Sequence, residues 1–129
     1  MKQASLSLLL LVSASLIAVV ALFFLPKKGL PVSDMRDVNG TVSIVLRDTG
    51  FDPQSVRIRR GTTVVFSTTR SNQFWPASNP HPTHDIYPKF DARVPISPDS
   101  TWSFRFDDIG TWNYHDHIRS YFTGTVYVE

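Results

Sequence analysis

The chain is 129 residues long, which is enough for one domain. It carries 13 Lys and Arg against 11 Asp and Glu, a formal net charge of +2, and it has no cysteine. Three of the basic residues flank an N-terminal apolar run, so the rest of the chain is close to neutral, which argues against nucleic acid as a partner. The lack of cysteine excludes disulfides, thiolate metal ligands and a cysteine nucleophile.

Residues 1–29 are predicted to be a membrane anchor or signal segment. Residues 4–25 are uncharged and apolar apart from four serines, and a helix of that length spans about 33 Å, close to the thickness of a bilayer's hydrocarbon core. A cleaved signal peptide is the alternative, with Val19-Val20-Ala21 as the only plausible cleavage site. We favour an uncleaved single-pass anchor in the cell membrane, with the following domain on the extracytoplasmic side, periplasmic or extracellular.

Residues 30–39 have no periodicity and are predicted to be a linker, which leaves 40–129 as the folded domain. Apolar and polar residues alternate there with a period of two, which is typical of half-buried strands. The apolar positions of this pattern are Val42, Ile44, Leu46, Val56, Ile58, Val64, Phe66, Trp102, Phe104 and Phe106. Further strands are expected around Trp112 and Tyr114 and over 125–128. With no helical periodicity after residue 30, the pattern predicts an all-β sandwich.

Residues 70–100 interrupt this pattern with a long irregular stretch that contains six prolines. Loops of such length are unusual in a compact domain, and they commonly carry function. We therefore expect this loop to contribute to a site.

All four histidines fall into two close pairs, His81 with His84 in the long loop and His115 with His117 after the last aromatic strand. Positions i and i+2 of a strand share a face, so His115 and His117 can converge on one ion while Asp116 points away. A single histidine in a domain of this size is usually a surface or core residue. Two pairs and no stray histidine instead predict a shared metal site with all four as ligands.

Asp85 and Asp116 are weaker candidate ligands, because carboxylates beside histidines are at least as often hydrogen-bond partners that orient the imidazole. Asp91 is predicted to be structural, and Trp75 to be a wall of the site or part of the core. Imidazole with optional carboxylate suits several divalent metals, and intrinsic affinity is highest for Cu(II). Copper is therefore the favoured cofactor, with zinc as the alternative.

The strand motifs resemble those of the cupredoxins over residues 40–128. The resemblance rests on the order of five segments, which are Phe51-Asp-Pro53, Val56-Arg-Ile58, Gly61-Thr-Thr-Val-Val-Phe66, Phe106-Asp-Asp-Ile-Gly110-Thr-Trp112-Asn-Tyr114-His115 and Gly124-Thr-Val-Tyr-Val128. It implies a Greek-key β-sandwich with a metal at the end where the long loop and the His-Asp-His loop meet. Asp116 stands where that family's blue-copper sites have cysteine, and Tyr121 and Thr125 stand near the later ligand positions, which argues against a blue electron carrier.

The favoured function is therefore copper binding through a cysteine-free histidine cluster, for copper handling rather than as an enzyme. A redox protein at a non-blue copper centre, carrying out electron transfer or oxidase or superoxide chemistry, is one alternative. An interaction module that binds no metal is another. The segment Trp112-Asn-Tyr-His-Asp-His117 also resembles the His-x-His segments of multicopper oxidases, which suggests a homo-oligomer that shares copper. Other expected partners are the metal ion, the membrane, and a copper-handling or redox protein.

Overall fold

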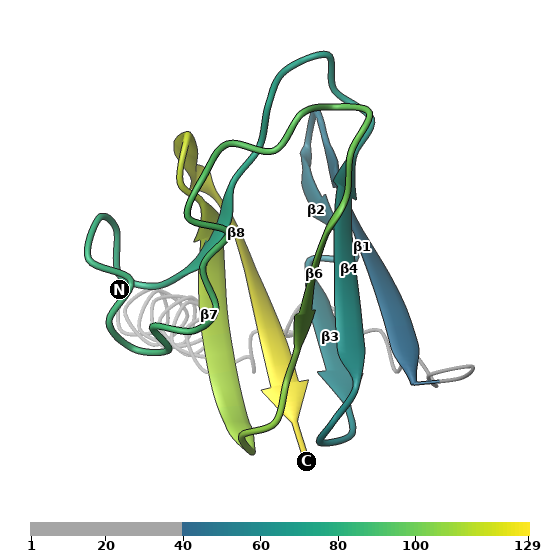
Figure 1. Ribbon diagram of the computed structural model, residues 1–129, viewed down its shortest axis with the longest axis vertical. Helices are drawn as coiled ribbons and strands as arrows, with labels where there is room; N and C mark the ends of the chain where they lie inside the picture. The colour runs from purple at the N-terminus through teal and green to yellow at the C-terminus, as the bar shows by residue number, and fades with distance from the viewer. Residues whose placement is uncertain (1–39) are drawn as a thin grey trace, which may run out of the picture.

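The computed structural model describes residues 40–129, which form eight β-strands in two four-stranded sheets (Figure 1). The strands are β1 (Thr41–Arg47), β2 (Gly50–Asp52), β3 (Ser55–Ile58), β4 (Thr63–Thr68), β5 (Pro76–Ser78), β6 (Trp102–Arg105), β7 (Gly110–Asp116) and β8 (Arg119–Val128). The predicted membrane segment and linker lie outside the described residues. Between residues 40 and 129, no helix is long and apolar enough to cross a membrane.

The first sheet has the order β2-β1-β4-β6 and the second the order β3-β8-β7-β5. The chain passes repeatedly between the sheets, so β1 pairs with β4 and β3 with β8 in parallel, while the other pairs are antiparallel. This arrangement confirms the all-β sandwich that the period of two predicts.

The alternation places one set of side chains between the sheets. Phe66 of β4 and Tyr114 of β7 are fully buried, and their rings meet edge to face with centroids 5.5 Å apart. The ring centroid of Phe90, in the long loop, lies 5.7 Å from that of Phe66 and 5.5 Å from that of Tyr114. Aromatic pairs at these separations contribute about 0.5–1.5 kcal/mol each beyond their burial. The long loop is therefore part of the core as well as part of the surface.

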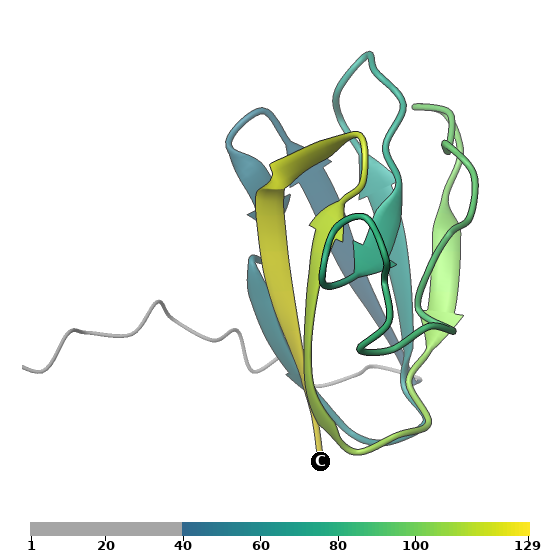
Figure 2. The same ribbon diagram turned by 90° about the vertical axis from the view of Figure 1, so that its left-hand side faces the viewer.

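The long loop also adds main-chain pairing to the second sheet. The Ser78 N–H donates to the Phe90 carbonyl at 2.7 Å, the Ala92 N–H donates to the Pro76 carbonyl at 3.0 Å, and Ala77 bridges Asp91. Residues 90–92 thus run alongside β5 as a short extension of the sheet. Figure 2 shows the segment after β5 lying over β7, on the side away from the first sheet.

Candidate metal centre

The four histidines gather over β7 and β5, on the face of the second sheet opposite the core. Their ring centroids are 4.6 to 6.5 Å apart. His81, His115 and His117 each offer a ligand nitrogen, and these nitrogens all lie within 4.8 Å of one another. The structure therefore brings together the two pairs that the sequence predicts to share a site, although more than 30 residues separate them.

The strand register places His115 and His117. Tyr114 points into the core, so its neighbour His115 leaves β7 on the opposite face, where the loop buries it to 1 % exposure. A β-bulge between His115 and Asp116 shifts the pairing with β8. Beyond it, the His117 N–H donates to the Trp75 carbonyl at 2.7 Å, and the His117 ring lies 4.3 Å from the Trp75 ring. Trp75 is thus a wall of the site.

The loop between β5 and residues 90–92 carries the other pair. His81 is exposed, whereas His84 is buried with 6 % exposure. The His84 N–H donates to the Pro80 carbonyl at 2.9 Å, and His84 has a left-handed backbone with φ of 55°. This conformation is strained for a residue with a Cβ, and such strain is concentrated at functional sites.

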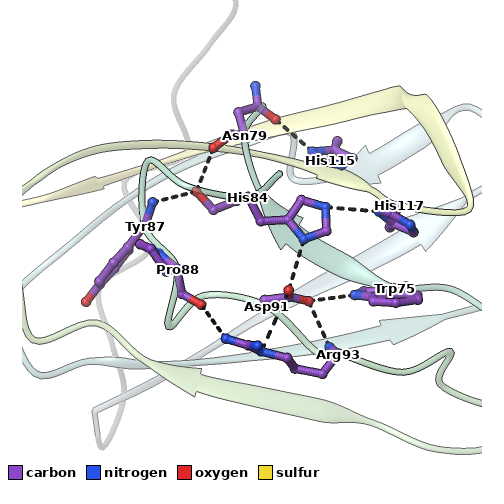
Figure 3. A network of polar contacts seen from close by, with 10 residues as sticks. Trp75, Asn79, His84, Tyr87, Pro88, Asp91, Arg93, His115 and His117 are labelled. Atoms are coloured by element: carbon purple, nitrogen blue, oxygen red, sulfur yellow. Dashed lines mark hydrogen bonds and ion pairs between the residues drawn. The ribbon is translucent and has the colours of Figure 1, made fainter. Parts of the chain in front are cut away.

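Hydrogen bonds determine which nitrogen of each buried ring carries a proton (Figure 3). His115 Nδ1 lies 2.8 Å from Asn79 Oδ1, and His84 Nδ1 lies 2.9 Å from Asp91 Oδ2. Both acceptors are oxygens without a proton, so both Nδ1 atoms donate, and each Nε2 keeps its lone pair. His117 Nδ1 lies 2.9 Å from His84 Nε2 and therefore donates to it. With the rings uncharged, these hydrogen bonds leave the lone pairs of His84, His115 and His117 on Nε2.

Burial keeps two of these rings uncharged. It is the main cause that lowers the pKa of His115 from 6.5 to about 4, and the three neighbouring imidazoles add to the effect. The same causes lower the pKa of His117. At neutral pH both rings are therefore uncharged, as metal coordination requires.

Asp91 and Asn79 orient the cluster, whereas the sequence predicts only a structural role for Asp91 and none for Asn79. The Trp75 Nε1–H donates to Asp91 Oδ1 at 2.7 Å, and the Arg93 N–H donates to the same oxygen at 2.8 Å. Burial by itself raises the pKa of Asp91, but the hydrogen bonds from Trp75, His84 and the Arg93 backbone outweigh it and lower the pKa below its ordinary value. Asp91 is thus an anionic acceptor. No local signal marks it, because its position depends on pairing with β5.

The weaker candidate ligands lie elsewhere. Asp116 is fully buried, and its Oδ1 accepts the Trp75 N–H at 2.7 Å. Its Oδ2 lies 3.7 Å from Arg119 Nη1. Asp85 is exposed. Neither carboxylate belongs to the group formed by His81, His115 and His117.

The cluster fits a transition-metal ion. Buried His115 Nε2 has no hydrogen-bond partner among the described residues, and leaving such a group unsatisfied costs about 1–3 kcal/mol. His115 also offers a ring nitrogen within 4.8 Å of ring nitrogens of His81 and His117. Three imidazole donors without thiolate or thioether suit a divalent transition-metal ion.

No protein-family model and no curated protein matches the sequence. Solved structures resemble the fold. A reduced single-residue mutant of amicyanin has a TM-score of 0.60 at 15 % identity, covering 78 % of this chain and 92 % of amicyanin. The Cu(I) form of another amicyanin mutant has a TM-score of 0.61 at 15 % identity, covering 73 % and 87 %. A purple cupredoxin from Nitrosopumilus maritimus has a TM-score of 0.55 at 16 % identity, covering 68 % and 99 %. The fold is therefore cupredoxin-like, and within it this chain has a histidine cluster and no cysteine.

Proposed function

We propose that this protein binds Cu(II) through its histidine cluster and serves in copper handling at the extracytoplasmic face of a membrane. The observation that carries the proposal is the convergence of His81, His115 and His117, with the buried Nε2 of His115 unpartnered. The similar solved structures are copper proteins by name or by the Cu(I) state given for them. Nε2 of His115 and His117 and a ring nitrogen of His81 would hold the ion.

Metal loading of the purified full chain tests the proposal. We expect stoichiometric copper and a tetragonal Cu(II) paramagnetic resonance spectrum with nitrogen hyperfine structure. An intense blue absorption is not expected, because that band needs a thiolate and the chain has no cysteine. His115→Ala should lose the copper, while the exposed variant Asp85→Ala serves as the matched control. An intense blue band, or copper binding that survives His115→Ala, would contradict the proposed site.

Zinc is the competing metal. Its binding would fit the same donors, since imidazole suits both ions. Competition between the two metals for the full chain should favour copper by the intrinsic order of affinities. If zinc occupied the site at equal free concentrations of the two metals, zinc rather than copper would be the preferred ion. An interaction module without metal would show no change in melting temperature with either ion, whereas a bound ion stabilises the fold through linkage.

Electron transfer at this centre is the second candidate. It is favoured by the similar structures, which include amicyanin in reduced and oxidised states. Against it, the cluster offers no soft sulfur ligand for Cu(I). A reversible one-electron couple in voltammetry of the copper-loaded chain would support electron transfer. Irreversible loss of copper on reduction would support handling of Cu(II).

Membrane attachment rests on the apolar run of residues 4–25. We expect the full chain to stay with the membrane fraction after an alkaline carbonate wash and to keep its N-terminal segment by intact mass. Release into the soluble fraction with loss of about the first 21 residues would instead support cleavage after Ala21.

A further inference from the structure

Asp91, His84 and His117 form a continuous chain of hydrogen bonds that ends within the histidine cluster (Figure 3). Asp91 Oδ2 accepts from His84 Nδ1 at 2.9 Å, and His84 Nε2 accepts from His117 Nδ1 at 2.9 Å. The side chains of His84 and Asp91 are 7 % and 10 % exposed, so water competes little for these bonds. The chain is therefore a buried polar network in which each member restrains the next.

If the rings are neutral, only one placement of their protons satisfies both hydrogen bonds. A carboxylate only accepts, so His84 Nδ1 carries a proton and His84 Nε2 does not. His117 Nδ1 must then be the donor to His84, which leaves the lone pair of His117 on Nε2. Asp91 sets the donor-to-acceptor direction of these hydrogen bonds. Its other carboxylate oxygen accepts two further N–H groups, from Trp75 and Arg93, which hold the carboxylate in place.

Coordination by His84 would break this chain. If His84 Nε2 bound the ion, the Nδ1–H of His117 would lose its acceptor. If His84 Nδ1 bound it, the carboxylate of Asp91 would lose its imidazole donor. His84 also lies outside the group of three histidines whose nitrogens come within 4.8 Å of one another. The same ring cannot orient His117 and bind the ion through one lone pair.

We propose that His84 is a positioning residue rather than a ligand: held by Asp91, it fixes the ring and tautomer of His117 so that Nε2 faces the ion. The ion then has three histidine ligands, His81, His115 and His117. This inference rests on the proposed metal binding and specifies its ligand set. The left-handed backbone of His84, with φ of 55°, is consistent with a ring whose placement matters more than its local backbone energy. A histidine that binds a metal commonly donates its second ring N–H to a neighbouring acceptor, which fixes its tautomer, and His84 Nε2 is that acceptor for His117.

A first test needs no metal. Long-range nitrogen–proton correlation spectra of the metal-free full chain, at a pH where the rings are neutral, report which nitrogen of each ring is protonated. We expect His84 and His117 both to carry the proton on Nδ1. A proton on Nε2 of His117 would overturn the proposal, whatever the metal affinity.

A second test counts coordinated imidazoles by electron spin echo modulation of the Cu(II)-loaded chain. His84→Gln keeps one acceptor and one donor group but removes the imidazole. We expect three coordinated imidazoles in the wild type and in His84→Gln, and two in the matched control His81→Gln. Four in the wild type, with three in His84→Gln, would overturn the proposal and leave copper binding itself intact.

The copper affinities of His84 variants distinguish a positioning role of this side chain from a packing role. His84→Ala should weaken copper binding by about 10- to 100-fold, and His84→Gln should restore most of that loss. Asp91→Asn should also weaken binding while the imidazole count stays at three. An equal loss in His84→Ala and His84→Gln would contradict the positioning role. Failure of the wild type to bind copper at all would instead refute the proposed function, and the tautomer measurement would still decide the role of His84.

Discussion

Ala77 and His115 lie directly opposite each other in the antiparallel pair of β5 and β7, and their side chains leave the sheet on the same face. Ala77 also pairs with Asp91 on its other side. His115, Ala77 and Asp91 thus form a row whose central side chain is a single methyl group. His84 spans this row, because it bonds Asp91 while its ring centroid is 5.2 Å from that of His115.

The row predicts that a larger side chain at position 77 displaces His84. Ala77 is fully buried, so in Ala77→Leu the added carbons must enter the space between His115 and Asp91, the residue to which His84 bonds. We expect copper affinity to fall by about tenfold or more and stability to fall by about 1–3 kcal/mol from overpacking. Calorimetric copper titration and chemical denaturation measure the two effects. Ala77→Ser, with a side chain close to alanine in size, is the control and should bind nearly as the wild type does.

Trp75 should report copper binding by fluorescence. Its ring lies 4.3 Å from that of His117, so an ion held by His117 would lie close to this indole and would quench its fluorescence. The other two tryptophans, Trp102 and Trp112, pack with Phe90 and Tyr87 instead. Cu(II) should therefore quench the wild type strongly, and Trp75→Phe should lose most of that response. Equal quenching in Trp75→Phe and the wild type would place the ion elsewhere.

The metal-free protein should lose stability in mild acid. The pKa of His115 is about 4 in the fold against 6.5 ordinarily, so between these values the unfolded chain binds a proton that the folded chain does not. This contribution is fully present above pH 6.5 and is lost as the pH falls toward 4. Urea denaturation from pH 7.5 to 4 measures it.

His115→Gln is the control for this pH dependence, because glutamine does not titrate in the same range. Its stability should change less than that of the wild type between pH 6.5 and 4. The lowered pKa of His117 adds a residual slope of the same sign. Identical slopes in the two proteins would show that His115 is not the responsible group.

The two carboxylates near the histidines should prove dispensable for copper. Asp116 accepts the Trp75 N–H and lies beside Arg119, so Asp116→Asn keeps an oxygen acceptor and the imidazole ligands. Asp85 is exposed. We expect both Asp116→Asn and Asp85→Ala to keep copper affinity within about threefold, against losses of about 10- to 100-fold for variants that disturb ligand orientation. A larger loss in Asp116→Asn, with the fold intact by circular dichroism, would make Asp116 a ligand.

Much of the fold follows from local sequence, because the period of two is visible wherever one face of a strand is buried. Val42, Ile44 and Leu46 are all buried, as their alternation predicts. The edge strand β5 could not be predicted in this way. It is three residues long, begins with a proline, and is buried at every position, so neither length nor alternation marks it.

The site divides in the same way. The histidine pairs are evident from spacing alone, since His115 and His117 are two residues apart and His81 and His84 share one loop. Their orienting partners are not, because Asp91 is held beside His84 by its pairing with Ala77, and Asn79 contacts His115 from 36 residues away. The difference between a ligand and a positioning residue depends on a hydrogen bond between His84 and His117, which are 33 residues apart. Sequence spacing carries no information about it.

Phe90 and Asp91 are consecutive residues with different roles. Phe90 packs in the core, and Asp91 accepts a hydrogen bond from His84. Because the two residues are adjacent, the position of the carboxylate is tied to the burial of the neighbouring phenyl ring. The ligands would thus be oriented only in the folded chain. We therefore expect the protein to fold first and to bind copper afterwards. The ion would then be loaded onto the finished protein, and folding itself would require no metal.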